Sequence, residues 1–317
     1  MKAEPRITVA RKRRFADQML AASTTPVGFV DVGAGGPLKM PWTLLPPGRV
    51  KKYNIEPEEA QAGVVPLCAS DREGRAVLFV ARDPRSSSLH PAAESFIERF
   101  ANDGTTAVRE FEVECVTLDA FLAGQWDRID LVDINAEGHD ARVIQGAAGL
   151  LGHGTVSLIR VEVLLTEVWQ GQGWFSDIDH ALRMSGYDLL TVDLESDRPA
   201  AVRRLQHAGE VLWGKALYAP SADAWQSALM QGRDAAEDRV LKAVALYVIA
   251  DALGRASELF AAADRAGVLR RVASDEIRRL IRWVFQYAEV EARAHELLRA
   301  LNARRWGGAL ARLVKRH

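Results

Sequence analysis

The sequence has few cysteines, almost no net charge and no long apolar run, and each absence excludes a class of protein. Cys68 and Cys115 are its only cysteines in 317 residues, too few for a disulfide framework and without the spacing of a metal site. We interpret them as buried thiols in a reducing compartment. The formal net charge of −1 gives no overall attraction to nucleic acid or membranes. No apolar stretch suits a membrane span or a secretory signal, so we expect a cytoplasmic protein.

Segments typical of strands and helices alternate from about residue 28 to residue 220. Predicted strands cover 28–32, 49–56, 63–69, 76–81, 108–116, 129–136, 156–165, 187–194 and 215–220. Predicted helices cover 117–124, with Thr117 as cap, 138–151, and 175–186, which Gly186 closes. This alternation predicts an α/β fold with a Rossmann-like, doubly wound and mostly parallel sheet.

Strand signals end near Pro220. Residues 235–267 have the pattern of two antiparallel helices with Gly254 near their turn, and 274–306 continue as helix. We therefore predict a basic N-terminal segment (1–27), an α/β domain (28–220) and an all-helical C-terminal extension (221–317).

The stretch GFVDVGAGG predicts a ligand site at the end of the first strand. Glycines such as Gly33 and Gly35 let a ligand approach the backbone and accept positive φ angles. Ligands of parallel α/β sheets bind beyond the carboxyl ends of the strands. Glu56 ends the next strand, at the place where an acid typically binds ribose hydroxyls.

Two cofactors use such a turn. A dinucleotide site expects G-x-G-x-x-G, but Leu38 occupies the third glycine position and Pro37 lies inside the turn. Asp31 has no role in a dinucleotide site, whereas S-adenosylmethionine carries an ammonium group that an acid there can bind. The turn therefore favours S-adenosylmethionine over NAD, and a glycine turn without a ligand is the structural alternative.

Several spaced motifs, in this order, resemble the FkbM-type S-adenosylmethionine-dependent methyltransferases. The resemblance runs from about residue 28 to residue 220. Its motifs are VDVGAGG (30–36), NIEPEEA (54–60), VVPLCASDREGRAVLFV (64–80), RSSSL (85–89), TLDAFL (117–122), IDLVDINAEGHDARVIQGA (129–147), IRVEV (159–163) and SDIDHALRMSGYDL (176–189). The order of the motifs is more specific than any one of them.

The resemblance implies a class I methyltransferase that uses S-adenosylmethionine to O-methylate a sugar hydroxyl of a polysaccharide, glycolipid or glycosylated natural product. The implied cofactor-binding residues are Asp31, Gly33, Ala34, Gly35, Glu56, Ala69 and Ser70. The chain departs from the family at Asn135, where Asp is usual, and at Asp140, where Glu is usual. Because Asn is neither a base nor a charged metal ligand, the use of a divalent metal stays open.

A sugar hydroxyl needs a base or a metal to remove its proton. The resemblance implies that the side chains which orient and deprotonate the acceptor lie at the ends of the fourth and fifth parallel strands. The candidate catalytic residues are Asn135, Glu137, His139 and Glu162, and the candidate substrate-binding residues are Ser88, Asp140 and Trp169.

Each of these residues has a structural alternative. Glu137 could cap the following helix, where Asp140 would favour the helix dipole, and His139 could be a solvated first-turn residue. Glu162 lies in an apolar strand and requires a partner, which could be substrate, a metal, or an arginine such as Arg160 or Arg142. The serines around Ser88 could form a simple turn, and Trp169 a hydrophobic rim.

The tail from Leu269 is rich in arginine. One interpretation is peripheral contact with an anionic membrane or glycolipid acceptor; the alternative is an ordinary amphipathic helical subdomain with solvated arginines. No motif indicates nucleic-acid binding, and the sequence does not specify an oligomeric state.

The main alternative function, which Asn135 motivates, is a scaffold or binding module. In this alternative, a methyltransferase fold with weak or no catalysis binds partners through its helical C-terminal region.

Overall fold

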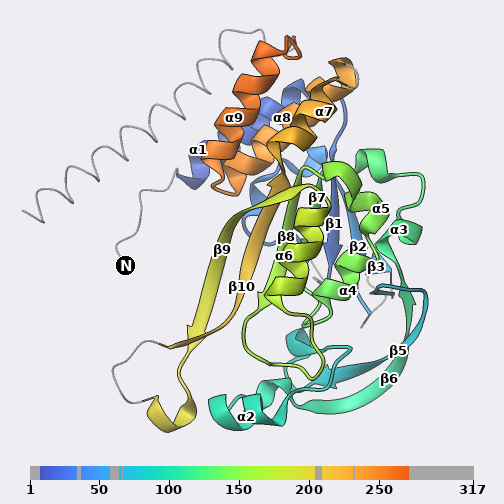
Figure 1. The fold of residues 1–317 in the computed structure, drawn as a ribbon, viewed down its shortest axis with the longest axis vertical. Helices are drawn as coiled ribbons and strands as arrows, with labels where there is room; N and C mark the ends of the chain where they lie inside the picture. The colour runs from blue at the N-terminus through green and yellow to red at the C-terminus, as the bar shows by residue number, and fades with distance from the viewer. Residues whose placement is uncertain are drawn as a thin grey trace, which may run out of the picture.

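A seven-stranded sheet runs through the molecule with the order β3-β2-β1-β7-β8-β10-β9 (Figure 1). The computed structural model describes residues 8–33, 37–57, 64–65, 67–203, 209–230 and 233–270. The sheet contains β1 (Val27–Val32), β2 (Val50–Ile55), β3 (Val64–Val65), β7 (Leu131–Ile134), β8 (Leu158–Leu164), β9 (Tyr187–Asp197) and β10 (Glu210–Pro220). Only β10, which pairs antiparallel with β8 and β9, opposes the other six in direction. The predicted α/β fold with a mostly parallel central sheet is confirmed.

Three described strands form a second sheet, which the sequence patterns did not separate from the first. This sheet has the order β4-β6-β5 and contains β4 (Cys68–Ala69), β5 (Gly74–Ala81) and β6 (Ala107–Val116). The segment predicted as one strand over 63–69 is divided between the two sheets, and Pro66 separates its halves in the sequence. A period of two identifies a strand but not its partners, so the patterns left this division open.

The helix predicted over 138–151 is instead two short helices, α4 (Asp140–Gln145) and α5 (Ala148–Leu151). Gly146 lies at the break, where a Cβ atom would come within 1.9 Å of the Ser70 carbonyl oxygen. This close approach of the two backbones fixes a glycine there and joins the end of α4 to the residue after β4. Thr117 caps α3 (Leu118–Phe121) as predicted, because its hydroxyl accepts the Ala120 N–H at 3.1 Å.

Helices pack against both faces of the central sheet. Alternate strand residues face opposite sides, so Phe29 and Leu158 belong to one hydrophobic core while Val30 and Ile159 belong to the other. The first core is shared with α1 (Val9–Ala22), α7 (Ala222–Met230), α8 (Arg233–Ile249) and α9 (Leu253–Arg265). The second is shared with α3, α4, α5 and α6 (Phe175–Met184), and α2 (Glu94–Phe100) lies beside a smaller cluster. The boundary predicted near residue 220 stays a prediction. Helices from both sides of it, such as α1 and α8, share one hydrophobic core.

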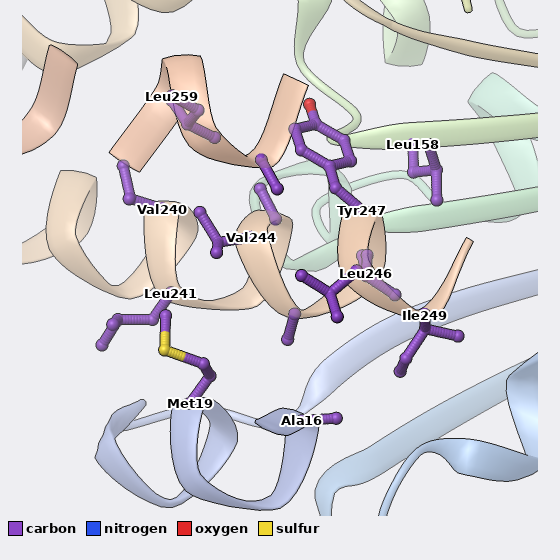
Figure 2. Packing of buried hydrophobic residues seen from close by; sticks show 14 of the residues in the cluster. Ala16, Met19, Leu158, Val240, Leu241, Val244, Leu246, Tyr247, Ile249 and Leu259 are labelled. Carbon is purple, nitrogen blue, oxygen red and sulfur yellow. The ribbon is translucent and has the colours of Figure 1, made fainter. Parts of the chain in front are cut away.

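Helix α8 is buried on all sides from Val240 to Ile249 because other elements surround it. Figure 2 shows Ala16 and Met19 of α1 on one side of α8 and Leu259 of α9 on the other. Tyr247 is fully buried, and its hydroxyl donates to the Ser157 carbonyl at 3.0 Å. Gly254 belongs to the first turn of α9, and the described helices are neither long nor apolar enough to cross a membrane. Residues 271–317, which include most of the basic tail, lie outside the described residues.

A buried ion network attaches α8 to the sheet. The Lys242 Nζ atom lies 2.8 Å from Asp130 Oδ2 and 3.7 Å from Asp238 Oδ2. Asp130 also accepts the Gly28 N–H at 2.9 Å, and Asp238 accepts the hydroxyls of Thr24 and Thr25. Buried charges of this kind are tolerated because each has a partner.

We expect Lys242→Met to lower the free energy of unfolding by about 3–5 kcal/mol, because it leaves the Asp130 carboxylate buried without its cation. The measurement is urea unfolding followed by circular dichroism. The matched control is Arg75→Met, which breaks an ion pair with Glu112 whose side chains are each 68% exposed and should cost less than about 1 kcal/mol. Equal losses in both variants would contradict the assigned role of the network.

Candidate functional site

A cavity of about 500 Å³ opens at the carboxyl ends of the parallel strands. The strand order reverses between β1 and β7, and ligands of such sheets bind at this switch point. The cavity extends from the ends of β1, β2 and β4 to the ends of β8 and α2. Its walls include the predicted residues Gly33, Glu56, Ala69, Ser88, Asn135, Glu137, His139, Glu162 and Trp169.

Gly33 brings the ends of three strands together. Its φ angle is +74°, and a Cβ atom would lie 2.0 Å from the Asn135 carbonyl oxygen. Its N–H donates to the Ile55 carbonyl at 3.0 Å, while the Asn135 N–H donates to the Val32 carbonyl at 2.9 Å. The predicted glycine turn therefore begins where β1, β2 and β7 meet. Ala34 and Gly35 lie outside the described residues.

Asp31 lies one residue before the cavity wall and is paired with Lys52. The Lys52 Nζ atom is 2.7 Å from Asp31 Oδ2, whereas the buried Oδ1 atom has no hydrogen-bond partner among the described residues. Burial raises the pKa of Asp31, and Lys52 opposes this shift. One oxygen of this carboxylate is thus neutralised within the protein while the other keeps its capacity to accept.

Four side chains, carried by β8, β10 and the turn that follows β7, meet at the wall of the cavity. The Asn135 amide donates to Glu137 Oε1 at 3.2 Å, and its oxygen accepts from Lys215. The same Lys215 Nζ atom lies 3.0 Å from Glu162 Oε1. Asn135 therefore connects the ammonium group of Lys215 to the carboxylate of Glu137.

The strand register explains why these residues meet. Asp133 pairs with Arg160 across β7 and β8, and Glu162 pairs with Lys215 across β8 and β10. Two residues along a strand return to the same face, so Asn135 comes level with Glu162. Arg160 binds Asp133, with its Nε atom 2.9 Å from Asp133 Oδ1.

The partner of Glu162 is therefore Lys215, and neither arginine suggested by the sequence takes this role. Arg160, two residues before Glu162 on β8, forms its ion pair with Asp133 of β7. Arg142 instead lies 3.3 Å from Asp71, after β4. Lys215 reaches Glu162 because the antiparallel β10 is inserted beside β8.

Glu137 is strained and has a perturbed acidity. Its φ angle is +48°, a left-handed conformation uncommon for residues with a side chain and often found at functional sites. Burial raises the pKa of Glu137 well above its usual value, as do the neighbouring carboxylates of Glu162 and Asp140. Lys215 and Asn135 oppose this shift. A carboxylate with a raised pKa is a stronger base than an ordinary glutamate.

The hydrogen bonds that close the turn before α4 belong to Asp140. Its carboxylate accepts the Ala136 N–H at 3.0 Å and the Gly138 N–H at 3.1 Å. Burial, followed by the charge of Glu162, raises its pKa to about 7. The Ser88 hydroxyl donates to the Glu137 carbonyl at 2.6 Å and so supports the same turn. In the part of the chain that the structure describes, no group of three or more His, Cys, Asp or Glu forms a metal-binding cluster.

His139 belongs to a chain of hydrogen bonds. Its Nδ1 atom lies 3.1 Å from His90 Nε2, and its Nε2 atom lies 3.0 Å from the Ser70 hydroxyl oxygen. The second nitrogen of His90 faces the Gln170 carbonyl at 3.1 Å. Burial, together with His90, lowers the pKa of His139 to about 4, so the ring is neutral at pH 7. Both nitrogens are engaged, which leaves no free position for a base directed at a substrate.

The far end of the cavity is aromatic. Trp213 and Leu164 pair across β10 and β8, next to Lys215 and Glu162, and Phe96 of α2 lies 6.4 Å from Trp213 between ring centroids. Trp169 is 1% exposed, and its ring packs on Gly138, so it forms part of the wall. Asn102 and Thr105 add polar groups to this end.

Lys215, His90 and Trp213 were not recognised from the sequence. Lys215 could have been recognised, because a lysine inside the apolar run that ends β10 requires a partner, as Glu162 does in its own strand. His90 and Trp213 could not, because single histidines and tryptophans are common in loops and strands.

We expect Gly33→Ala to lower the free energy of unfolding by more than about 1 kcal/mol, since the positive φ angle and the Asn135 carbonyl both oppose a Cβ atom. The measurement is urea unfolding. The control is Gly48→Ala, at which a Cβ atom would meet nothing within 4 Å, and which should be close to neutral. A neutral Gly33→Ala would show that the turn is not held as described.

Comparison with known proteins agrees with the motifs. The model of the Methyltransferase FkbM domain matches residues 39–189. No curated protein matches the chain. Among solved structures, the chain is similar to the magnesium protoporphyrin IX methyltransferase (ChlM) of Synechocystis PCC 6803 with bound SAM, at 13% identity and a TM-score of 0.31, over 67% of this chain and 81% of that one. The family match confirms the predicted resemblance to the FkbM methyltransferases over residues 39–189.

Proposed function

We propose that the protein is an S-adenosylmethionine-dependent methyltransferase that methylates a sugar hydroxyl of a polysaccharide, glycolipid or glycosylated natural product. One observation carries this proposal. The polar cluster of Asn135, Glu137 and Glu162 lines the same cavity as Gly33 and Glu56. A candidate cofactor-binding turn and a candidate base thus share one cavity, as transfer between two bound molecules requires.

The residues present fit the cofactor. Gly33 gives the close backbone approach, Glu56 ends β2 on the cavity wall, and Asp31 keeps one buried oxygen with no partner among the described residues. We assign Glu56 to the ribose hydroxyls and the free Asp31 oxygen to the ammonium group. When bound, S-adenosylmethionine supplies an electrophilic methyl group. Ala69 belongs to the same wall, whereas the predicted roles of Ser70, Ala34 and Gly35 stay predictions.

Glu137 is the general base in this proposal. Its raised pKa makes it a better proton acceptor than an ordinary carboxylate. The ion pair of Glu162 and Lys215 lies next to it, so the charges of the cluster can redistribute when Glu137 takes up a proton. The proton of the acceptor hydroxyl passes to Glu137, and the positive charge of Lys215 balances the carboxylate that remains at Glu162. His139, neutral and bonded at both nitrogens, orients the wall.

Asn135 has a role that an aspartate could not fill in the same way. It accepts a hydrogen bond from Lys215 through its oxygen and donates one to Glu137 through its nitrogen. A carboxylate could accept from Lys215 but could not donate to Glu137, and it would add a fourth acid to the cluster. The departure from the usual Asp of the family is therefore compatible with catalysis.

The lining at the acceptor end supports a sugar. Trp213 and Phe96 offer apolar faces, and Asn102 and Thr105 offer hydrogen-bonding groups. Sugar rings present apolar C–H faces and a rim of hydroxyls, so a mixed aromatic and polar lining suits them.

We expect the protein to bind S-adenosylhomocysteine with micromolar affinity and Glu56→Ala to lose most of this binding, because the ribose hydroxyls lose their acceptor. Isothermal titration calorimetry measures both. Glu112→Ala, at an exposed position of β6, is the control and should bind as the wild type does. A folded wild-type protein that does not bind would overturn the methyltransferase proposal in favour of a scaffold.

We expect Glu137→Gln to reduce methyl transfer by about 100-fold or more, the usual contribution of a general base, while S-adenosylhomocysteine binding persists. Transfer of tritiated methyl groups to a panel of polysaccharides and glycosides measures the rate.

The wild-type rate should fall as the pH drops through the raised pKa of Glu137, since the protonated acid accepts no proton. Lys215→Met should move this midpoint to higher pH, because Lys215 lowers the pKa of Glu137. An unchanged midpoint would exclude Glu137 as the titrating group.

A further inference from the structure

The two cysteines lie side by side, although 46 residues separate them in the sequence. Cys68 of β4 and Cys115 of β6 are direct partners in the parallel pairing of these strands. Because paired residues of neighbouring strands project from the same face of a sheet, their side chains lie next to each other, and both thiols are free. Neither thiol has a role in the methyl transfer described above.

The two thiols differ in acidity and access. Cys115 is partly exposed, and the hydrogen bond from the Cys68 thiol lowers its pKa, whereas burial and the nearby Asp71 oppose this shift. The same contact, with burial, raises the pKa of the buried Cys68. Cys115 is thus the better thiolate and the one that a small solute can reach, which are the two requirements of a reactive cysteine.

We propose that Cys68 and Cys115 form a thiol oxidation site in the wall of the cofactor cavity, which a peroxide converts into a disulfide. The strand register carries this inference, because it places the two cysteine side chains next to each other, with Cys68 in the cavity wall. Disulfides in reducing compartments are usually transient and serve redox sensing.

The chemistry needs only hydrogen peroxide as oxidant. The Cys115 thiolate attacks one peroxide oxygen, the O–O bond breaks, and with one proton taken up the products are a sulfenic acid and water. The Cys68 thiol then attacks the Cys115 sulfur, its proton leaves with the hydroxide as a second water, and an S–S bond forms. Two thiols lose two hydrogen atoms, and one peroxide is reduced to two waters.

Oxidation would displace the cavity wall. A disulfide holds two Cβ atoms about 3.8 Å apart, closer than the spacing of about 4.8 Å between neighbouring strands. β4 has two residues and lies at the edge of its sheet, so we expect β4 to move toward β6 when the disulfide forms. Cys68 and Ala69 both line the cavity, and Ser70 connects β4 to His139. Given the proposed function, we infer that the disulfide weakens cofactor binding.

The test treats the reduced, full-length protein with hydrogen peroxide and stops the reaction with catalase. Intact mass spectrometry should show the loss of two hydrogen atoms, and peptide mapping should identify a Cys68–Cys115 link that dithiothreitol removes. Calorimetry with S-adenosylhomocysteine should show affinity lowered several-fold on oxidation and restored on reduction. Cys115→Ser should form no link and keep its affinity after the same treatment.

The outcomes separate this proposal from the function on which its last step depends. A mapped link in a protein whose reduced form does not bind S-adenosylhomocysteine supports the oxidation site and overturns the proposed function. Overoxidation of Cys115 without a link, or a link between two molecules, overturns the oxidation site. A link that leaves the affinity unchanged overturns the effect on the cofactor.

Discussion

The candidate site depends on the positive charge of Lys215. Three carboxyl groups, those of Glu137, Asp140 and Glu162, share a largely buried region, and such a group is costly unless cations and hydrogen bonds compensate it. Lys215 binds Glu162 directly and reaches Glu137 through the Asn135 amide. The register of β8 and β10 therefore determines the acidity of the site as well as the order of the sheet.

The sequence predicted the part of the fold that local patterns encode. Apolar runs located the strands, and the glycine turn and the acid-rich turn after β7 indicated two parts of the candidate site, although not its aromatic end. Pairing that depends on distant segments could not be predicted, because a period of two does not specify a partner. The separate sheet of β4, β5 and β6 and the contact of Lys215 with Glu162 are both of this kind. Gly146 shows the same limit, since the Ser70 carbonyl that leaves no room for a Cβ atom there lies far away in the sequence.

The molecule separates the elements that fix its core from those that form its cavity. Helices α1, α7, α8 and α9 gather at one end of the central sheet, and β5, β6 and α2 at the other, where the parallel strands end (Figure 1). The network around Lys242 fixes the first end. Glu137 with its positive φ angle lies at the second, together with the buried Asp31 Oδ1 atom, which has no partner among the described residues. Such a distribution is common where the requirements of binding conflict with those of stability.

The late position of β10 has a consequence for synthesis. The chain leaves the ribosome in sequence order, so Glu137 and Glu162 are made about fifty residues or more before Lys215. The segment that matches the family model ends at residue 189 and contains the acids but not their cation. A nascent chain that stops there must either keep these carboxyls in water or bury them in protonated form. The acidic centre can thus reach its final charge state only after β10 has emerged and taken its place beside β8.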